Sequence, residues 1–173
     1  MKSHLQEFAR WVNRLQQLMS AIVVVLFTVM MGVVLLQIGS RYLLSYATAW
    51  ATELSTFCQV WLVLLGAGVA MARNQHMAID LLPAMLPLRY ARIASILIAL
   101  VVLLFLGMMA YGSIPLVRLG TVQSSPAMGV PLWLVYACLP IGAAYIALEL
   151  VVSVVRRWDN PFAAPEIVDV EVA

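Results

Sequence analysis

Four long apolar stretches without a charged side chain dominate this sequence. They cover residues 15–40, 54–72, 93–117 and 132–148, and none contains Asp, Glu, Lys or Arg. Each is close to the length that a helix needs to cross the hydrocarbon core of a bilayer, about 20 residues. The pattern therefore predicts an all-α integral membrane protein with short interfacial amphipathic helices and four transmembrane helices, at about residues 18–40, 54–72, 93–117 and 132–155.

The basic residues between these stretches predict the orientation. Eight of them lie before the first stretch, between the second and third, or after the fourth, whereas only Arg41 and Arg118 lie in the other two connections. Because short cytoplasmic segments of membrane proteins are enriched in Lys and Arg, both termini are expected in the cytoplasm. Residues 18–157 would form the membrane domain. Residues 158–173, with two prolines and four acidic residues, would form a mobile cytoplasmic tail.

Residues 1–17 have the pattern of an amphipathic helix. Apolar side chains recur at spacings of three and four residues, beginning with Leu5, Phe8 and Val12, and polar side chains lie opposite them. Such a helix is expected to lie along the cytoplasmic membrane surface before the chain turns into the first span. The alternative is an exposed start to the first span itself. A cleaved signal peptide is disfavoured, because the first apolar run is about twice the usual length of a signal core.

Aromatic and charged side chains follow the first span. Tyr42, Tyr46 and Trp50 are spaced by four residues, which predicts an aromatic stripe on one helix face at the outer headgroup level. An aromatic belt explains this stripe better than a ligand site does. Arg41 closes the first span and Glu53 opens the second, and each charge suits the helix end on which it lies. Since neighbouring spans run antiparallel, an ion pair between Arg41 and Glu53 is expected.

Two connections are rich in proline. Residues 77–90 are apolar but interrupted by two prolines, so they are expected to form a short interfacial or re-entrant piece. Residues 118–131 contain the Ser, Pro and Gly of consecutive turns, and Pro131 suits the first turn of the fourth span. Inside the spans, Pro115 and Pro140 are expected to kink their helices.

Polar residues are rare inside the spans. Glu149 is the only acidic or basic residue at membrane depth, and it lies toward the cytoplasmic side, seven residues before Arg156. We expect it to pair with a cation at the inner headgroup level or with a polar group on a neighbouring helix. The amides of Gln37 and Gln59 are expected to join helices by hydrogen bonds rather than to bind a solute.

The composition argues against several functional classes. Hydrophobic residues make up 64% of the chain and charged residues 10%, and the connections are too short to form a soluble catalytic domain. No nucleophile, base and orienting residue can be assembled, so we do not expect an enzyme. The net charge of +2 reflects membrane topology and gives no reason to expect nucleic acid binding. Two cysteines, Cys58 and Cys138, fall within spans and are expected to be packed thiols.

Several short motifs occur in an order that resembles a known transporter family. The first group consists of Arg41-Tyr42, Trp50-x-x-Glu53-Leu54, Trp61, Gly66-Ala67, and Ala70 with Arg73, His76 and Asp80. The second consists of Ser125-Pro126-Ala127-x-Gly129-x-Pro131-x-Trp133-x-x-Tyr136, followed by Pro140 and Gly142. In this order, over about residues 15–155 and four spans, they resemble the small membrane subunit (DctQ-like) of tripartite ATP-independent periplasmic (TRAP) transporters.

The resemblance implies a supporting role in the bacterial inner membrane. In such transporters a periplasmic substrate-binding protein captures an organic acid such as a dicarboxylate, and a large multi-span permease subunit moves it inward with sodium ions. The sodium ions are expected in that large subunit, and no cofactor or metal is expected in this chain. The small subunit would contact the large subunit and membrane lipids. The candidate structural or interface residues are Arg41, Trp50, Glu53, Arg73, His76, Asp80, Ser125, Pro126, Gly129, Pro131 and Glu149.

Two other functional classes stay open. A homodimeric four-helix exporter would be expected to carry a carboxylate in the first span, which here is uncharged. A small anchor subunit of a respiratory or another membrane complex would be expected to carry paired haem-ligating histidines, whereas His4 and His76 lie outside the spans. Neighbouring genes for a large permease and a secreted binding protein would separate these classes.

Overall fold

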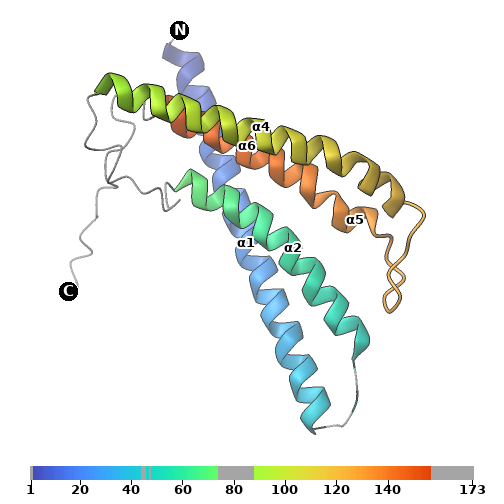
Figure 1. The fold of residues 1–173 in the computed structure, drawn as a ribbon. Helices are drawn as coiled ribbons and strands as arrows, with labels where there is room; N and C mark the ends of the chain where they lie inside the picture. Colours follow the sequence, from blue (N-terminus) through green and yellow to red (C-terminus); the bar gives the residue numbers. More distant parts are fainter. Residues whose placement is uncertain (1, 44–45, 47, 74–87, 157–173) are drawn as a thin grey trace, which may run out of the picture.

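The computed structural model describes residues 2–43, 46, 48–73 and 88–156, which form α-helices and no strand (Figure 1). The helices are α1 (Lys2–Leu43), α2 (Ala49–Ala72), α4 (Leu88–Gly120), α5 (Trp133–Tyr136) and α6 (Cys138–Arg156). Four segments are long and apolar enough to cross a membrane, at Arg10–Leu43, Ala49–Ala72, Arg89–Gly120 and Trp133–Arg156. The predicted all-α fold with four transmembrane helices is confirmed.

Helix α1 is a single uninterrupted helix of 42 residues. It includes the residues that were expected to form a separate surface helix, and the expected turn before the first span is absent. Neither proline nor glycine occurs before Gly32, so nothing in the sequence stops the helix there. At a rise of 1.5 Å per residue α1 is about 63 Å long, roughly twice the thickness of the hydrocarbon core. Contact of residues 1–17 with the membrane surface stays a prediction.

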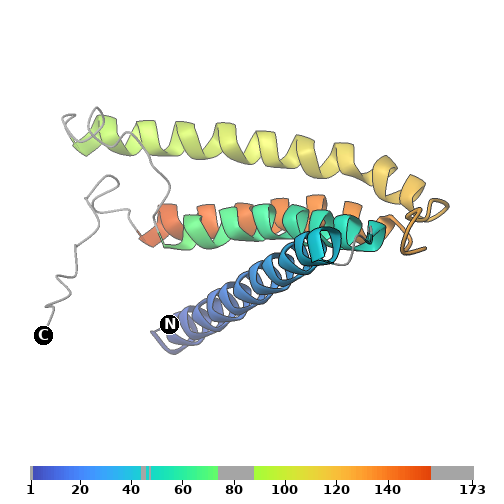
Figure 2. The same cartoon turned by 90° about the horizontal axis from the view of Figure 1, so that it is seen from below.

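The long helices pack in the order α1, α2, α6, α4 (Figure 2). Helix α2 contacts both α1 and α6, and α6 contacts α4. Throughout the described residues, the Cα atoms of α1 stay more than 8 Å from those of α4 and α6. This open arrangement leaves many large apolar side chains of α1 and α4 exposed, which is ordinary for helices that face lipid.

The closest packing involves α6, which lies between α2 and α4. Leu106 of α4 packs with Ala143 and Ile146 of α6 in the buried core. On the other side of α6, the ring of Tyr145 lies against Gly68 of α2, where a Cβ atom would clash with it. Small residues at such positions let membrane helices approach closely. Helix α6 therefore joins α2 to α4.

The helix of the fourth span is interrupted close to Pro140, and the kinks expected at Pro115 and Pro140 stay predictions. Helix α5 ends at Tyr136, α6 begins at Cys138, and Ala137 separates them. Proline has no N–H, so the carbonyl of Tyr136 lacks the helical donor that would lie four residues further on. Pro115 lies inside α4 and does not end it. Both cysteines are buried and free, as predicted.

Candidate functional site: a glutamate held by the α4–α5 loop

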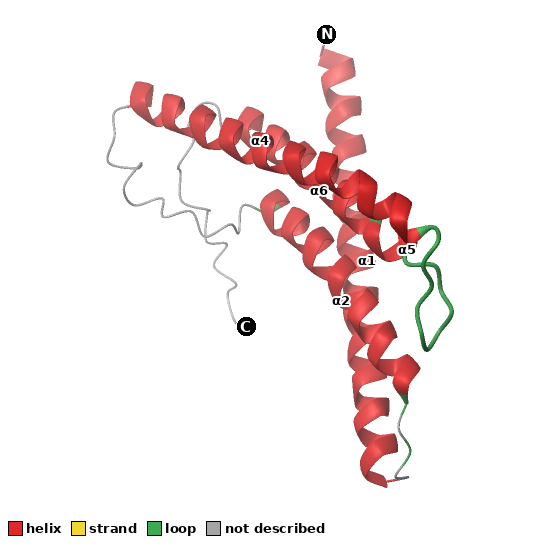
Figure 3. Cartoon of the chain, turned by 45° about the vertical axis from the view of Figure 1, so that its right-hand side comes forward, coloured by secondary structure: helices red, strands yellow, loops and turns green. Residues whose placement is uncertain are grey.

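The loop between α4 and α5 closes onto the beginning of α2 (Figure 3). We call this the loop end of the molecule, where α1 and α4 end and α2 and α5 begin. The opposite, terminal end is where α1 and α4 begin and α2 and α6 end. Each end holds one buried or partly buried glutamate, Glu53 at the loop end and Glu149 near the terminal end.

Glu53 of α2 accepts three hydrogen bonds from the loop. The hydroxyl of Ser125 donates a hydrogen bond to Oε2. The backbone N–H of Ala127 donates to Oε1 at 3.0 Å, and that of Met128 donates to Oε2 at 3.1 Å. Two backbone amides and one hydroxyl around a carboxylate form an arrangement that favours the ionised acid. The contact ties the beginning of α2 to the loop between α4 and α5, more than 70 residues away in the sequence.

Hydrogen bonds within the loop hold these donors in place. The N–H of Ser125 donates to the carbonyl of Val130, and the N–H of Gly129 donates back to the carbonyl of Ser125, each at 2.9 Å. Ser124 and Pro131 form an isolated antiparallel bridge at the base of the turn. The loop is therefore a closed turn whose own hydrogen bonds hold the backbone donors that bind Glu53.

The predicted residues of this loop each have a physical role. Ser125 supplies the hydroxyl and is buried, with only 3% of its surface exposed. Pro126 occupies the second position of the turn, where its ring sets the required φ. Gly129 has a φ of +67°, in the left-handed region that favours glycine. The prediction for Pro131 was wrong: α5 begins at Trp133, and Pro131 belongs to the bridge at the base of the loop.

The predicted ion pair between Arg41 and Glu53 is not formed. Arg41 lies in the last turn of α1 and is exposed, while both oxygens of Glu53 bind the loop. A carboxylate has about four lone-pair positions, and three loop donors occupy most of them. Charges at helix ends predict only which sign suits each end. They carry no information about a loop more than 70 residues away in sequence.

The predicted aromatic stripe on one helix face is also wrong. Helix α1 ends at Leu43 and α2 begins at Ala49. Tyr46 therefore lies outside both helices, and Trp50 belongs to a different helix from Tyr42. All three rings are exposed at the loop end. Their role in an aromatic belt at the membrane surface stays a prediction.

Polar side chains join α1 to the start of α2. The amide nitrogen of Gln37 donates to the hydroxyl of Thr52 at 2.7 Å, which confirms the prediction that this glutamine joins helices. The hydroxyls of Ser40 and Thr48 lie 3.4 Å apart. Gln59, the second predicted amide, is exposed on α2 and has no hydrogen bond to another described residue. It does not join helices within this part of the chain.

Glu149 lies near the terminal end, where it is almost fully buried, with 1% of its surface exposed. The amide nitrogen of Gln16 on α1 donates to its Oε2 at 2.7 Å. The predicted polar partner on another helix is thereby confirmed. The second oxygen, Oε1, and the hydroxyl of Tyr145 one turn earlier are also buried, and neither has a hydrogen-bond partner among the described residues.

Two arginines make further polar contacts at the terminal end. Arg156 of α6 donates to the side-chain oxygen of Asn13 at 3.1 Å, and Arg73, just after α2, donates to the hydroxyl of Ser20 at 3.4 Å. His76 and Asp80, which were expected to accompany Arg73, lie outside the described residues. Among the residues that are described, no three His, Cys, Asp or Glu side chains could together hold a metal ion.

Asn13, Gln16 and Ser20 were not identified as contact residues from the sequence. A signal was available, because their spacings of three and four residues place them on one face of a helix. Such a face can equally be the solvated side of an amphipathic helix, so the spacing alone did not predict a contact. Only the position of α6 beside it distinguishes the two.

Comparison with known proteins shows the family of this chain. Residues 30–160 match the family described as "Tripartite ATP-independent periplasmic transporters, DctQ component". This chain belongs to the DctQ family. The match covers Glu53, its loop and Glu149, whereas Gln16 lies before its first residue. The resemblance predicted from the motifs is confirmed, and the family is one of transporter components.

Two similar proteins carry related names. A "Putative TRAP transporter small permease protein" of Haemophilus influenzae is 23% identical over 152 residues, which are 88% of this chain and 90% of that protein. An "Isethionate TRAP transporter permease protein DctMQ" of Oleidesulfovibrio alaskensis is 26% identical over 106 residues, which are 60% of this chain but only 17% of that protein. The chain is thus similar to a small permease protein along nearly its whole length.

Proposed function

We propose that this DctQ-family subunit supports a large multi-span permease subunit in sodium-driven, binding-protein-dependent uptake of an organic acid such as a dicarboxylate. The observation that carries the proposal is the open order α1, α2, α6, α4. Apart from the side-chain contacts between α1 and α6 at the terminal end, each helix packs only against its neighbours in this row, and such a row encloses no central pathway within the described residues. The same arrangement offers extensive helix surface to a partner in the membrane.

The exposed amide of Gln59 supports a protein partner in the membrane. Gln59 lies in the middle of α2, and no described residue accepts or donates a hydrogen bond to it. Because hydrocarbon provides no hydrogen-bond partner, an amide at this depth is more stable against a polar group of another helix. Thr52 and Thr56 are exposed on the same helix, Thr52 four residues before Thr56 and Thr56 three residues before Gln59. Such spacings place the three side chains on one face of α2.

The relative DctMQ also supports a large partner. The segment similar to this chain makes up 17% of that protein, which is named as a permease protein. The name of DctMQ refers to isethionate, and that substrate is not carried over to this chain. We propose only the wider class of organic acids here, with the substrate and sodium sites in the large subunit and the first capture by a periplasmic binding protein.

The proposed location is the bacterial inner membrane with both termini in the cytoplasm. The terminal end carries most of the described arginines, including Arg10, Arg14, Arg73, Arg89 and Arg156. The loop end carries Arg41 and Arg118. This asymmetry supports a cytoplasmic terminal end and, with it, a periplasmic position for the Glu53 loop.

Co-purification followed by reconstitution tests the function. The chain, carrying an affinity tag, is expected to co-purify with a co-expressed large permease subunit. The pair with its binding protein is expected to take up an organic acid from a panel under a sodium gradient. This chain alone in liposomes is the matched control and is expected to transport none. Sodium-driven uptake by the chain alone would overturn the supporting role, and so would full uptake by the large subunit without it.

A further inference from the structure

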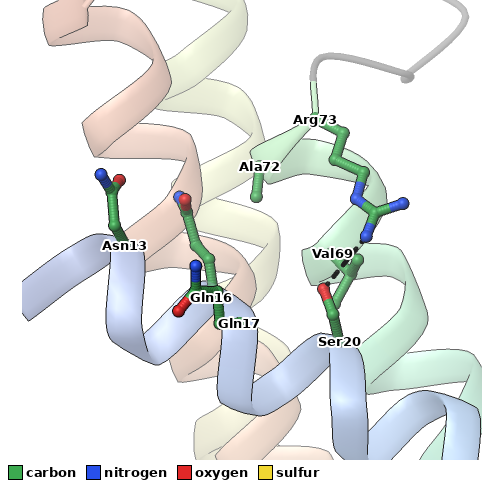
Figure 4. A pocket seen from close by; sticks show the side chains of 7 residues that line it. All are labelled: Asn13, Gln16, Gln17, Ser20, Val69, Ala72 and Arg73. Atoms are coloured by element: carbon green, nitrogen blue, oxygen red, sulfur yellow. Dashed lines mark hydrogen bonds between the residues drawn. The ribbon is translucent and has the colours of Figure 1, made fainter.

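A pocket of about 380 Å³ lies between α1 and α2 at the terminal end (Figure 4). Its size falls within the range of small-molecule sites, about 300–1,000 Å³. One wall carries polar side chains of α1, among them Asn13, Gln17 and Ser20, and the other carries Arg73 at the end of α2. No acidic side chain is among its lining residues.

The pocket lies at the border of the apolar region. Arg73 follows directly on the apolar helix Ala49–Ala72, and Asn13 immediately precedes Arg14, the last charge before the long apolar stretch of α1. Val69 and Ala72 form the apolar part of the lining. A ligand held here would meet charged and polar groups on one side and hydrocarbon on the other, as a phospholipid does where its headgroup meets its acyl chains.

The polar groups of the pocket still have donors to offer. Arg73 carries five N–H groups, of which one makes a 3.4 Å hydrogen bond to Ser20. Ser20 accepts that bond, so its own hydroxyl hydrogen is available. Asn13 accepts from Arg156 through its oxygen, which leaves its NH₂ group available, and Gln17 has no hydrogen bond to another described residue. Several donors around one cation suit an anion with several acceptor oxygens.

One electrostatic effect opposes an anion at this position. The C-terminal end of α2 carries the negative end of its helix dipole, equivalent to roughly half a charge. The N–H of Arg73 donates to the carbonyls of Val69 and Met71, which satisfies part of that end. The full positive charge of the Arg73 side chain exceeds the remaining partial charge. On the preceding turns of α1, Arg10 and Arg14 outnumber the one carboxylate, Glu7, around a second pocket of about 190 Å³.

We propose that this pocket binds the phosphate group of an anionic phospholipid. Arg73 would supply the positive charge, the hydroxyl of Ser20 and the amides of Asn13 and Gln17 would donate hydrogen bonds, and Val69 and Ala72 would contact the start of the acyl chains. A soluble organic phosphate has the same anionic group, but it would leave the apolar side of the pocket without a partner. The proposal does not depend on the transported substrate.

Lipid retention by the purified chain tests the proposal. The full-length protein is exchanged into nanodiscs of phosphatidylcholine with or without phosphatidylglycerol, released into detergent and measured by native mass spectrometry. Wild-type protein is expected to retain phosphatidylglycerol selectively. Arg73→Gln is expected to lower its affinity about tenfold, the usual cost of losing hydrogen bonds to a charged group. Ser20→Ala keeps the charge and is expected to have a smaller effect.

Arg41→Gln is the matched control, since it removes an exposed arginine from the other end of α1. It is expected to retain phosphatidylglycerol as wild type does. Equal loss of phosphatidylglycerol from Arg73→Gln and Arg41→Gln would overturn the proposal in favour of a diffuse attraction between arginines and anionic lipids. Unchanged retention of phosphatidylglycerol in Arg73→Gln would also overturn it. Competition by soluble glycerophosphate would overturn the assignment to a lipid. Co-purification with the large subunit is measured in parallel. If Arg73→Gln loses the large subunit while its lipid retention is unchanged, the pocket is assigned to an acidic group of that subunit instead.

Discussion

Gln16 and Glu149 are joined by a 2.7 Å hydrogen bond although their helices, α1 and α6, never approach closely along their backbones. The two side chains span the gap that remains beside α2. Together with the contact of Arg156 and Asn13, this bond connects the first helix to the last at the terminal end. Since α2 is the one other described helix that α1 contacts, these polar contacts help to set the angle of the first helix.

Removing the donor of this bond should destabilise the chain. Gln16→Leu leaves the carboxyl group of Glu149 buried with neither oxygen bound, and we expect a loss of about 1–3 kcal/mol in the free energy of unfolding. Thermal unfolding of the purified protein in detergent measures the loss. Gln17→Leu, which removes the neighbouring exposed amide, is the control and should change stability little. Equal effects of the two substitutions would contradict a specific contact.

A double-mutant cycle should separate the true partner of Glu53 from the one predicted from helix ends. Glu53→Ala and Ser125→Ala each break the same hydrogen bond, so their effects on unfolding should not add. Glu53→Ala and Arg41→Ala should add, because these residues are not paired. Thermal unfolding of the wild type, the three single variants and the two double variants measures both cycles. Additive losses for Glu53 and Ser125 would mean that the loop is held by its own hydrogen bonds alone.

Gly129 should tolerate a side chain poorly. Its φ of +67° is strained for any residue with a Cβ atom, so Gly129→Ala is expected to cost about 1 kcal/mol and to loosen the loop that holds Glu53. Gly107→Ala is a suitable control, because that glycine lies in α4 with open space around it and alanine favours helix there. Proteolysis of the loop and thermal unfolding both report the difference. A neutral Gly129→Ala would show that the turn adopts another conformation.

Residue patterns were sufficient to predict the membrane spans and the turns of the α4–α5 loop. Charge-free stretches predict spans because hydrocarbon excludes charges, and this rule needs no knowledge of neighbours. The interruption near Pro140 followed in the same way from a missing N–H. The partner of Glu53 could not be predicted, since a carboxylate accepts from any nearby donor and the loop that supplies them lies far away in sequence. The packing order was also unpredictable, because lipid-facing and partner-facing surfaces are equally apolar.

The orientation is open to a direct test with reporter fusions. A reporter that is active only in the periplasm should be silent when fused after residue 158 and active when inserted near Ser124. The reason is the excess of arginine at the terminal end. A reporter active only in the cytoplasm provides the reciprocal control at both positions. The reverse pattern would place the Glu53 loop in the cytoplasm.

Two glycines of α2 provide a matched test of the contact between α2 and α6. A Cβ atom at Gly68 would clash with the ring of Tyr145, whereas one at Gly66, two residues earlier, has no heavy atom within 4 Å. Gly68→Ala should therefore push α6 away and destabilise the chain by about 1–3 kcal/mol, the usual cost of overpacking. Gly66→Ala should be neutral or slightly stabilising in this chain, since alanine favours helix. Unfolding of the isolated chain measures both effects, and equal losses would contradict the close approach at Gly68. If Gly66→Ala leaves stability unchanged but weakens co-purification with the large subunit, the exposed face around Gly66 contributes to that interface.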